Sequence, residues 1–384
     1  MSIVQESTTS FTRKGFSRRQ IGRMAALFAA GSAFPTDHEF AMAEQAEIEM
    51  LGPLAVTPDT VRISSNENPM GPAPEAVEMI HKIAKYGWRY RPFGESDTFT
   101  QTVAEIEGVK PEYVMPFAGS SDPLSRTGWA YTSRSRSWVM ADPSFGGRAP
   151  VYAGAEVIKV PVRADHTHDV EAMIKADPNA GVYYICNPNN PTGTVQPRKD
   201  IEYLLAHKKP YAVVVVDEAY IHFSEAEPCS DLVAADKDVV ILRTFSKLYG
   251  MAGLRAGMAI GRPDLLAMLE PYGSGSLPIT GIAAGIASLK AKNLVKDRRA
   301  LNKQIREDTL EHLEKKGVKY IPSETNFFMM EVGRPGAEFA RDMAKQKVII
   351  GRTWPIYPTM SRVTVGTKEE MMKFTAAMDK VMGV

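Results

Sequence analysis

Short apolar runs alternate with amphipathic stretches along most of the chain beyond residue 74. Continuous runs of hydrophobic residues are typical of strands that are buried on both faces. Four such runs occupy residues 137–141, 182–186, 212–216 and 239–242, and helical periodicity is present at residues 197–208 and 264–270. Strands that alternate with helices predict βαβ units and a mainly parallel sheet.

The two flanks of this pattern differ from its middle. Residues 57–74 contain proline and glycine, show no helical periodicity and are interpreted as an extended arm. Residues 282–316 are helix-compatible, and a strand at 327–331 and a closing helix from Lys368 follow them. We therefore predict an α/β fold. Its parts are an N-terminal arm (44–72), a large domain (73–290) and a smaller C-terminal α/β domain (291–384), with the long helix as the join.

The first 43 residues have a different character. Arg18 and Arg19 stand just before an apolar stretch, residues 24–34, that is too short to span a bilayer. An Ala-x-Ala cleavage pattern follows at residues 41–43. This order of features is typical of a twin-arginine signal peptide, so we expect residues 1–43 to direct export and the mature protein to be periplasmic or secreted. The alternative is a disordered tail that happens to hold an arginine pair.

The composition of the whole chain excludes several classes of protein. Its 384 residues include 46 Lys and Arg against 45 Asp and Glu, so the formal charge is +1. This balance gives no reason to expect binding to nucleic acid or stable association with a membrane. Two cysteines exclude a disulfide scaffold. The seven histidines show no metal-ligand spacing, and His166 and His168 are expected in a solvated loop, so we predict no metal site.

One lysine has neighbours that suit a phosphate-bearing cofactor. Lys247 lies in the segment TFSKLYGMAGLR, residues 244–255, which follows a buried strand. Thr244 and Ser246 can donate hydrogen bonds to a phosphate, and Arg255 can pair with it through two parallel hydrogen bonds. A lysine amine beside a phosphate site is suited to hold pyridoxal 5′-phosphate (PLP) as a Schiff base.

A carboxylate for the same cofactor precedes this segment. Asp217 follows a buried apolar run, and open α/β sheets bind ligands at the carboxyl ends of their strands. A carboxylate there can keep the pyridine nitrogen of PLP protonated. The sequence NPNNPTG, residues 187–193, forms a rigid turn directly after another predicted strand.

Taken in order, these motifs resemble the fold-type-I PLP-dependent aminotransferases of the aspartate aminotransferase superfamily, in particular its histidinol-phosphate aminotransferase-like branch. The motifs are NENPMGP (66–72), NPNNPTG (187–193), DEAY (217–220), TFSK with GLR (244–255) and RVTVG (362–366). The resemblance covers residues 60–384. It implies the fold of that class, PLP as cofactor, and transfer of an amino group from an amino acid or amine to a 2-oxo acid.

The resemblance also implies roles for residues around the cofactor ring. Lys247 would hold the cofactor and later shuttle a proton. Asp217 would pair with the pyridinium nitrogen, while Asn190 and Tyr220 would hydrogen-bond the ring hydroxyl. Phe145 fits the position of the aromatic residue that stacks on the ring.

Further roles concern the phosphate, the substrate and a second subunit. The phosphate would meet Ser120, Ser121 and Asp122, at a turn that opens a helix, together with Thr244, Ser246 and Arg255. Arg362 would clamp the substrate α-carboxylate, with Asn68 and Arg352 also on the substrate side. Tyr90 fits the tyrosine that reaches across a homodimer to the partner's phosphate. Two segments depart from the family pattern, namely Ser120-Ser121-Asp122 and Arg89-Tyr90-Arg91.

The reaction and the substrate stay open at this level. The same fold supports decarboxylases, racemases, lyases and oxidases, because cofactor motifs do not select which bond at Cα breaks. An exported, non-catalytic binding protein is the alternative from another class. Export argues against a role in histidine biosynthesis. Trp354 and Tyr357 either line an apolar or aromatic substrate pocket or pack between the domains.

Overall fold

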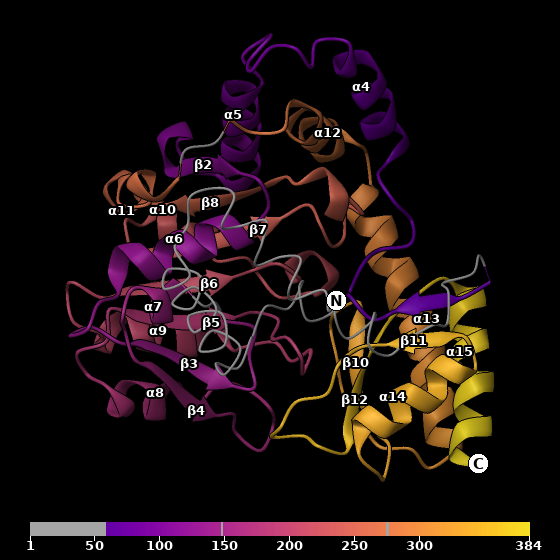
Figure 1. Cartoon of the computed structure of the whole chain (residues 1–384). Helices are drawn as coiled ribbons and strands as arrows, with labels where there is room; N and C mark the ends of the chain where they lie inside the picture. Colours follow the sequence, from indigo (N-terminus) through magenta and orange to yellow (C-terminus); the bar gives the residue numbers. More distant parts are fainter. Residues whose placement is uncertain (1–58, 147–148, 274–275) are drawn as a thin grey trace, which may run out of the picture.

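The computed structural model describes residues 59–146, 149–273 and 276–384 (Figure 1). The signal peptide predicted over residues 1–43 lies outside these ranges. Within them, a seven-stranded sheet forms the centre of the larger part of the molecule, and a three-stranded sheet lies in the C-terminal part. None of the helices in these ranges combines the length and the apolar composition needed to cross a lipid bilayer.

The large sheet is mainly parallel, as predicted. In spatial order its strands are β2 (Val114–Phe117), β8 (Gly257–Gly261), β7 (Val239–Thr244), β6 (Val213–Asp217), β5 (Val182–Cys186), β3 (Trp138–Asp142) and β4 (Val157–Pro161). Of these seven strands, β8 runs antiparallel to the other six. The carboxyl ends of the other six therefore face the same edge of the sheet.

Helices cover both faces of this sheet. One face packs on α5 (Glu95–Glu107), α8 (Val170–Ala176), α9 (Arg198–His207), α10 (Ser230–Ala234) and α12 (Ile279–Lys290), and α4 (Pro74–Ala84) lies against α12. The other face packs on α6 (Ser121–Tyr131) and α11 (Pro263–Ala267), and α7 (Ala149–Tyr152) lies against α6. The result is a three-layer α/β arrangement.

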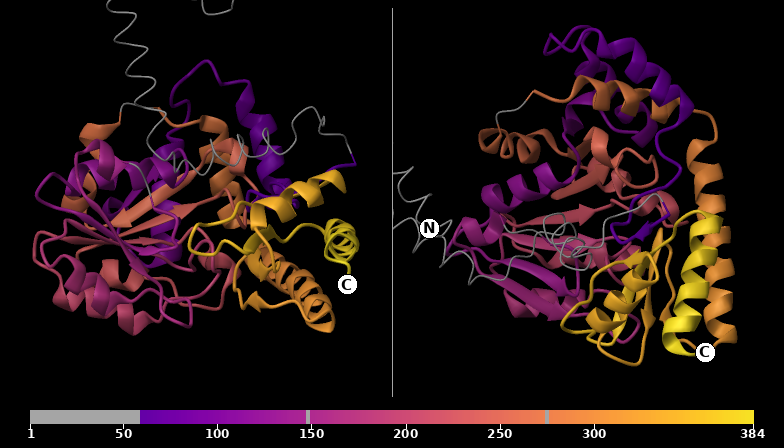
Figure 2. Two further views of the ribbon diagram at one scale, coloured as in Figure 1. Left: turned by 60° about the horizontal axis from the view of Figure 1, so that its bottom comes forward. Right: turned by 45° about the vertical axis from the view of Figure 1, so that its right-hand side comes forward.

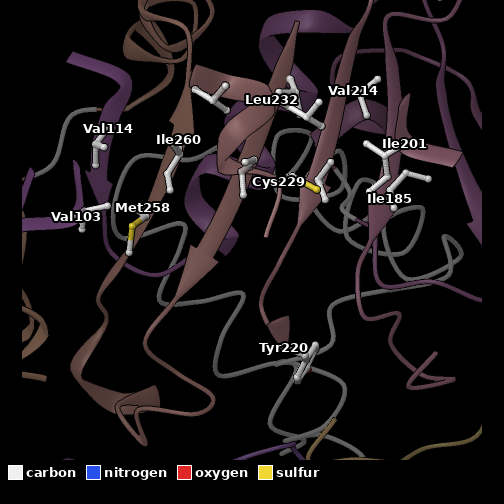
Figure 3. Packing of buried hydrophobic residues seen from close by; sticks show 14 of the residues in the cluster. Val103, Val114, Ile185, Ile201, Val214, Tyr220, Cys229, Leu232, Met258 and Ile260 are labelled. Carbon is white, nitrogen blue, oxygen red and sulfur yellow. The ribbon is translucent and has the colours of Figure 1, made fainter. Parts of the chain in front are cut away.

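The valines of β6 show why the sequence forms this arrangement. Successive side chains of a strand point to opposite faces, so Val213 and Val215 enter one helical layer while Val214 and Val216 enter the other. All four are buried, which stabilises the fold by about 1.5–3 kcal/mol for each side chain. Figure 3 shows Val214 among its neighbours in the core, together with Ile185 of β5.

The C-terminal part has its own hydrophobic core. Its antiparallel sheet has the order β12 (Met360–Thr364), β10 (Phe327–Glu331), β9 (Tyr320–Ile321), and it packs with α13 (Leu294–Lys315), α14 (Gly336–Lys345) and α15 (Lys368–Met382). A short strand from the arm, β1 (Val61–Ile63), pairs in parallel with β11 (Val348–Ile350). Figure 2 shows this part beside the large sheet. The arm therefore joins the C-terminal core before the chain enters the large one.

The sequence-based elements agree with the structure in type and differ at their ends. The helix expected at 264–270 is shorter, since α11 ends at Ala267. The helix-compatible region 282–316 contains two helices, because the backbone at Asn293 is left-handed (φ 58°) between α12 and α13. Asparagine tolerates this conformation better than most residues. The domain limits that we placed at residues 72 and 290 remain predictions.

We predict that Gly250→Ala destabilises the protein more than Gly317→Ala. Both glycines have a left-handed φ, +67° and +70°, so each alanine costs about 1 kcal/mol in backbone strain. A Cβ at Gly250 would lie 2.2 Å from the carbonyl oxygen of Gly71, whereas nothing lies within 4 Å of one at Gly317. The close approach should add about 1–3 kcal/mol. Urea unfolding at a fixed PLP concentration measures the free energy of unfolding of both variants. Equal losses of stability would contradict the prediction.

Candidate active site

A pocket lies where the parallel strands of the large sheet end. Nine residues predicted to bind the cofactor line it: Ser120, Ser121, Phe145, Asp217, Tyr220, Thr244, Ser246, Lys247 and Arg255. They lie at the ends of four strands, β2, β3, β6 and β7, or in the turns after them. Residues that are far apart in the sequence therefore meet because parallel strands end at one edge.

Lys247 lies between the arm and the end of β6. Its Nζ donates to the backbone oxygen of Ser65 (3.2 Å) and lies 5.5 Å from the centre of the Tyr220 ring. The side chain follows β7, is half-buried and lines the pocket. Ser65 was not predicted from the sequence, because its contribution is a backbone carbonyl.

Asp217 brings a carboxylate to the floor of the pocket. It is 2 % exposed, and its Oδ1 accepts a hydrogen bond from the amide of Ala219 (3.2 Å). Its Oδ2 accepts one from the hydroxyl of Tyr184 (3.0 Å). Burial, and next the charge of Asp217, raise the pKa of Tyr184 well above its usual value, so this hydroxyl remains a donor. Tyr184 was missed at the sequence level. The clue in the sequence was that Tyr184 lies two residues before Cys186 and therefore shares a face of β5 with it.

The opposite end of the pocket offers donors for an anion. Arg255 Nη1 lies 3.3 Å from the hydroxyl of Ser246, which accepts a hydrogen bond from Thr244 at 2.8 Å. Burial lowers the pKa of Arg255, so a bound anion would offset the cost of its buried charge. Gly119 has φ +88°, and a Cβ there would lie 2.2 Å from Arg255 Nη2. The absent side chain lets the guanidinium approach the amino end of α6, where free amides favour anions.

The carboxylate of Asp122 pairs with an arginine of the same helix. Both Asp122 carboxylate oxygens accept hydrogen bonds from Arg126, at 2.7 and 2.9 Å, one helical turn further along α6. The pair offsets the negative charge that Asp122 brings to an anion site. Any contribution of Asp122 to phosphate binding would therefore come from its backbone amide. Its predicted role in binding the cofactor remains a prediction.

The predicted partners of the ring hydroxyl lie in a buried polar network. The Tyr220 hydroxyl accepts a hydrogen bond from Asn66 Nδ2 (3.0 Å), and Asn190 Oδ1 accepts one from Arg362 Nη1 (2.8 Å). Arg362 is 1 % exposed and also donates through Nη2 to the backbone oxygen of Ser64 (2.7 Å). Sequence reasoning missed Ser64 and Asn66, although Asn66 opens the NENPMGP motif. This network links the cofactor pocket to the arginine predicted to bind substrate.

The other residues predicted on the substrate side lie close to Arg362 or to the lysine loop. The guanidinium carbons of Arg352 and Arg362 lie 4.8 and 5.4 Å from the Trp354 ring centre. The Tyr357 hydroxyl lies 2.9 Å from His166 Nδ1, so this aromatic turn touches the large domain. Asn68 Nδ2 donates to the Leu248 backbone oxygen (2.8 Å), one residue past Lys247.

Tyr90 lies away from this pocket in the single chain. Its side chain is 81 % exposed, beside Trp88 (71 %) and Phe93 (61 %) in the connection between α4 and α5. The predicted contact with the phosphate of a partner subunit remains a prediction. Among the described residues, no cluster of three His, Cys, Asp or Glu side chains is arranged to hold a metal ion.

These features fit PLP. A buried carboxylate, a lysine amine and a cradle that a Cβ at Gly119 would fill lie around one pocket. The fold and the site thus define a fold-type-I PLP-dependent transferase. The model of the aminotransferase class I and II family matches residues 58–378, and the chain belongs to this family.

Known proteins of this class cover nearly the whole described chain. A histidinol-phosphate aminotransferase of Moorella thermoacetica is 33 % identical over 337 residues, which are 84 % of this chain and 86 % of that protein. Another, of Symbiobacterium thermophilum, is 34 % identical over 334 residues, 85 % and 91 % of the two chains. The structure of a putative histidinol-phosphate aminotransferase from Erwinia carotovora atroseptica has a TM-score of 0.79 at 28 % identity, and it covers 84 % of this chain and 96 % of that one. The chain is accordingly a PLP-dependent aminotransferase.

A buried histidine is linked through Gln196 to the turn that carries Asn190. His168 is 1 % exposed, which corrects its expected place in a solvated loop. Its backbone amide donates to Gln196 Oε1 (2.7 Å), and Gln196 in turn donates to Asn187 Oδ1 (2.9 Å). Burial lowers the pKa of His168 to about 4, although neighbouring Asn189 opposes the shift.

We predict that this histidine makes stability fall on acidification. Because the pKa of His168 is lower in the folded chain than in the unfolded one, the unfolded state binds more protons below about pH 6.5. Its contribution is complete above that pH and is lost toward about pH 4. Between pH 7 and pH 5 the loss should be roughly 2 kcal/mol. Urea unfolding at both values should show that His168→Gln removes about this much of the pH dependence, whereas His81→Gln, at an exposed site, does not. An unchanged slope in His168→Gln would refute the assignment.

Proposed function

We propose that Lys247, Asp217 and Arg362 carry the transfer of an amino group from an amino acid or amine to a 2-oxo acid. The observation that supports this most is the convergence of the lysine, the buried carboxylate and the anion-binding donors on one pocket. Arg362 reaches the same network through Asn190. A non-catalytic binding protein would not need a lysine amine held inside such a pocket.

The residues would divide the chemistry between the two ends of the pocket. When bound, PLP supplies an aldehyde that accepts the amino group and a ring that withdraws electrons from Cα. Lys247 would hold the aldehyde carbon and then, once displaced by substrate, carry a proton from Cα. Asp217 would keep the ring nitrogen protonated, and Tyr220 with Asn190 would hydrogen-bond the ring hydroxyl. Phe145 would cover one face of the ring.

Phosphate and substrate would be held by separate arginines. Arg255, Thr244 and Ser246 would bind the phosphate together with the amides at the start of α6. Arg362 would bind the substrate α-carboxylate, because its hydrogen bonds to Asn190 and to the Ser64 carbonyl orient a guanidinium that carries five N–H donors. Arg352 would meet an anionic group on the substrate side chain, and Asn68 would support the lysine loop from the substrate side.

We predict that Lys247→Ala abolishes stable cofactor attachment and slows transamination by at least about 10³-fold, because the residue that holds the aldehyde and moves the proton is lost. Lys290→Ala, at an exposed site on α12, is the control and should behave as the wild type. The visible spectrum of mature protein is followed with a panel of amino donors that includes histidinol phosphate, and products are identified.

The donor panel also decides the reaction and the substrate. Bleaching of the yellow form with stoichiometric 2-oxo acid supports transamination. Amines, racemised acids or peroxide as products would show a different reaction at the same cofactor. The proposed export favours donors other than histidinol phosphate, and turnover with histidinol phosphate alone would overturn that preference.

A homodimer completes the proposal. Trp88, Tyr90 and Phe93 are all exposed in one short connection, and subunit contacts of an oligomer commonly bury such aromatic side chains. We predict that mixing Tyr90→Ala with Lys247→Ala protein restores activity. If Tyr90 serves the partner's site, a mixed dimer contains one site with both changes and one site with neither. If Tyr90 serves its own site, no intact site forms and activity stays lost.

Export is proposed on the order of signals in residues 1–43 alone. The mature chain would begin at Glu44 and would reach the periplasm or the exterior already folded, a property that suits a protein loaded with its cofactor. The N-terminal residue of protein recovered from a periplasmic extract tests this, and a full-length chain confined to the cytoplasm would refute it.

A further inference from the structure

Strand β5, which pairs with the strand of Asp217, places the hydroxyl of Tyr184 within hydrogen-bonding distance of the Asp217 carboxylate. Tyr184 and Cys186 occupy the same face of β5, and the register pairs Cys186 with Asp217 on β6. The Tyr184 hydroxyl lies 3.0 Å from Asp217 Oδ2, and the tyrosine is fully buried. Tyr184 does not line the pocket itself. Its hydroxyl therefore reaches the cofactor site through Asp217, with Cys186 beside it on the same strand.

Neighbouring groups fix the direction of this hydroxyl. The Tyr184 ring lies 5.4 Å from the ring of Trp138 on β3, tilted by 31°, and both residues are 0 % exposed. Close packing on the ring leaves little room for another rotamer. The hydroxyl remains protonated, because burial raises the pKa of Tyr184 well above its usual value. Tyr184 is thus a rigid and permanent donor.

Such a donor matters because Asp217 is 2 % exposed. Burial favours the neutral form of a carboxyl group, whereas hydrogen bonds from donors favour the ionised form. Donation from Tyr184 on Oδ2 and from the Ala219 amide on Oδ1 opposes protonation and also sets the plane of the carboxylate. A carboxylate held in this way is ready for the protonated ring nitrogen of PLP.

We propose that Tyr184 is a positioning residue for PLP binding, which acts by orienting Asp217 and keeping it ionised. The inference rests on the proposed role of Asp217. Other titratable groups face the same pocket, namely Lys247 and Arg255 after β7, Tyr220 after β6 and Cys186 at the end of β5. Tyr184→Phe leaves each of these side chains in place and removes only one oxygen atom.

The neighbouring residue on the same strand supplies a matched control. Tyr183 is equally buried, but it points to the opposite face, where its hydroxyl donates to the backbone oxygen of Asp177 (2.7 Å). Tyr183→Phe therefore removes a tyrosine hydrogen bond from the same strand without touching Asp217. A general weakening of the strand would affect both variants alike.

The experiment measures the dissociation constant of PLP for the apoprotein between about pH 5 and pH 9. Tyr184→Phe should bind PLP about 10-fold more weakly at neutral pH, in keeping with the loss of a hydrogen bond to a charged group. Without the donor the carboxylate is easier to protonate, so the acid limb of the profile should move to higher pH. Tyr183→Phe should change neither quantity. Equal profiles for the two variants would overturn the proposal.

A double-mutant cycle with Asp217→Asn tests the proposed role of Asp217 separately from that of Tyr184. Asp217→Asn should weaken PLP binding, and adding Tyr184→Phe to it should have little further effect. If Asp217→Asn binds PLP as the wild type does, the proposed role of Asp217 is wrong. If Asp217→Asn weakens binding while Tyr184→Phe acts independently of it, only the inference on Tyr184 is wrong.

A second probe covers the case in which Tyr184→Phe does not fold. Incorporation of 3,5-difluorotyrosine at position 184 keeps the hydroxyl and makes it a stronger donor. The acid limb of PLP binding should then move to lower pH. A shift to higher pH, or an unchanged limb, would overturn the proposal.

Discussion

The alignment of strand ends in the large sheet is the constraint on which the site depends. Hydrogen-bonded register places Cys186 of β5 beside Asp217 of β6, and Asp217 beside Leu242 of β7. Two residues beyond Leu242 the chain leaves the sheet at Thr244 and turns to Lys247. A slip of one residue in β6 would move Asp217 to the other face of the sheet, since side chains alternate. The position of the carboxylate relative to the lysine is therefore set by the backbone.

A buried charge network stabilises this register on the face that is turned away from the pocket. Glu218, next to Asp217, accepts from Arg243 Nε (2.8 Å), and Arg243 stands next to Thr244 and also pairs with Glu107 of α5. Glu218 is 0 % and Arg243 2 % exposed. Removing one partner of such a pair leaves an uncompensated buried charge, at a cost of about 3–5 kcal/mol. The residues that flank the site thus fasten β6 to β7 and to a helix.

What could be predicted from the sequence was local. Apolar runs identified the central strands, and Lys247, Asp217 and Arg255 were found because each lies in a motif beside such a run. Their meeting in one pocket confirms the expected fold, because parallel strands bring such motifs to one edge. The predicted roles of these residues are not settled by their proximity.

What could not be predicted depends on contacts between distant residues or on backbone atoms. In the sequence, Tyr184 is indistinguishable from the other residues of a buried strand. Its hydrogen bond to Asp217 joins residues that are 33 positions apart. Ser64 and Ser65 contribute carbonyl oxygens, which no side-chain pattern reveals. The helix break at Asn293 has no proline to mark it.

Several of these distant contacts are made by the N-terminal arm. Its strand β1 belongs to the C-terminal core through β11, while the backbone oxygen of Ser65, two residues further on, accepts a hydrogen bond from Lys247. Asn66 forms hydrogen bonds with Tyr220, in the turn after β6, and with Thr364 of β12. The backbone oxygen of Ser64 accepts one from Arg362 of β12. A displacement of the C-terminal part relative to the sheet would therefore disturb the contacts of both Arg362 and Tyr220. The residues predicted to bind substrate and cofactor are therefore linked through the short segment 64–66, which contacts both parts of the molecule.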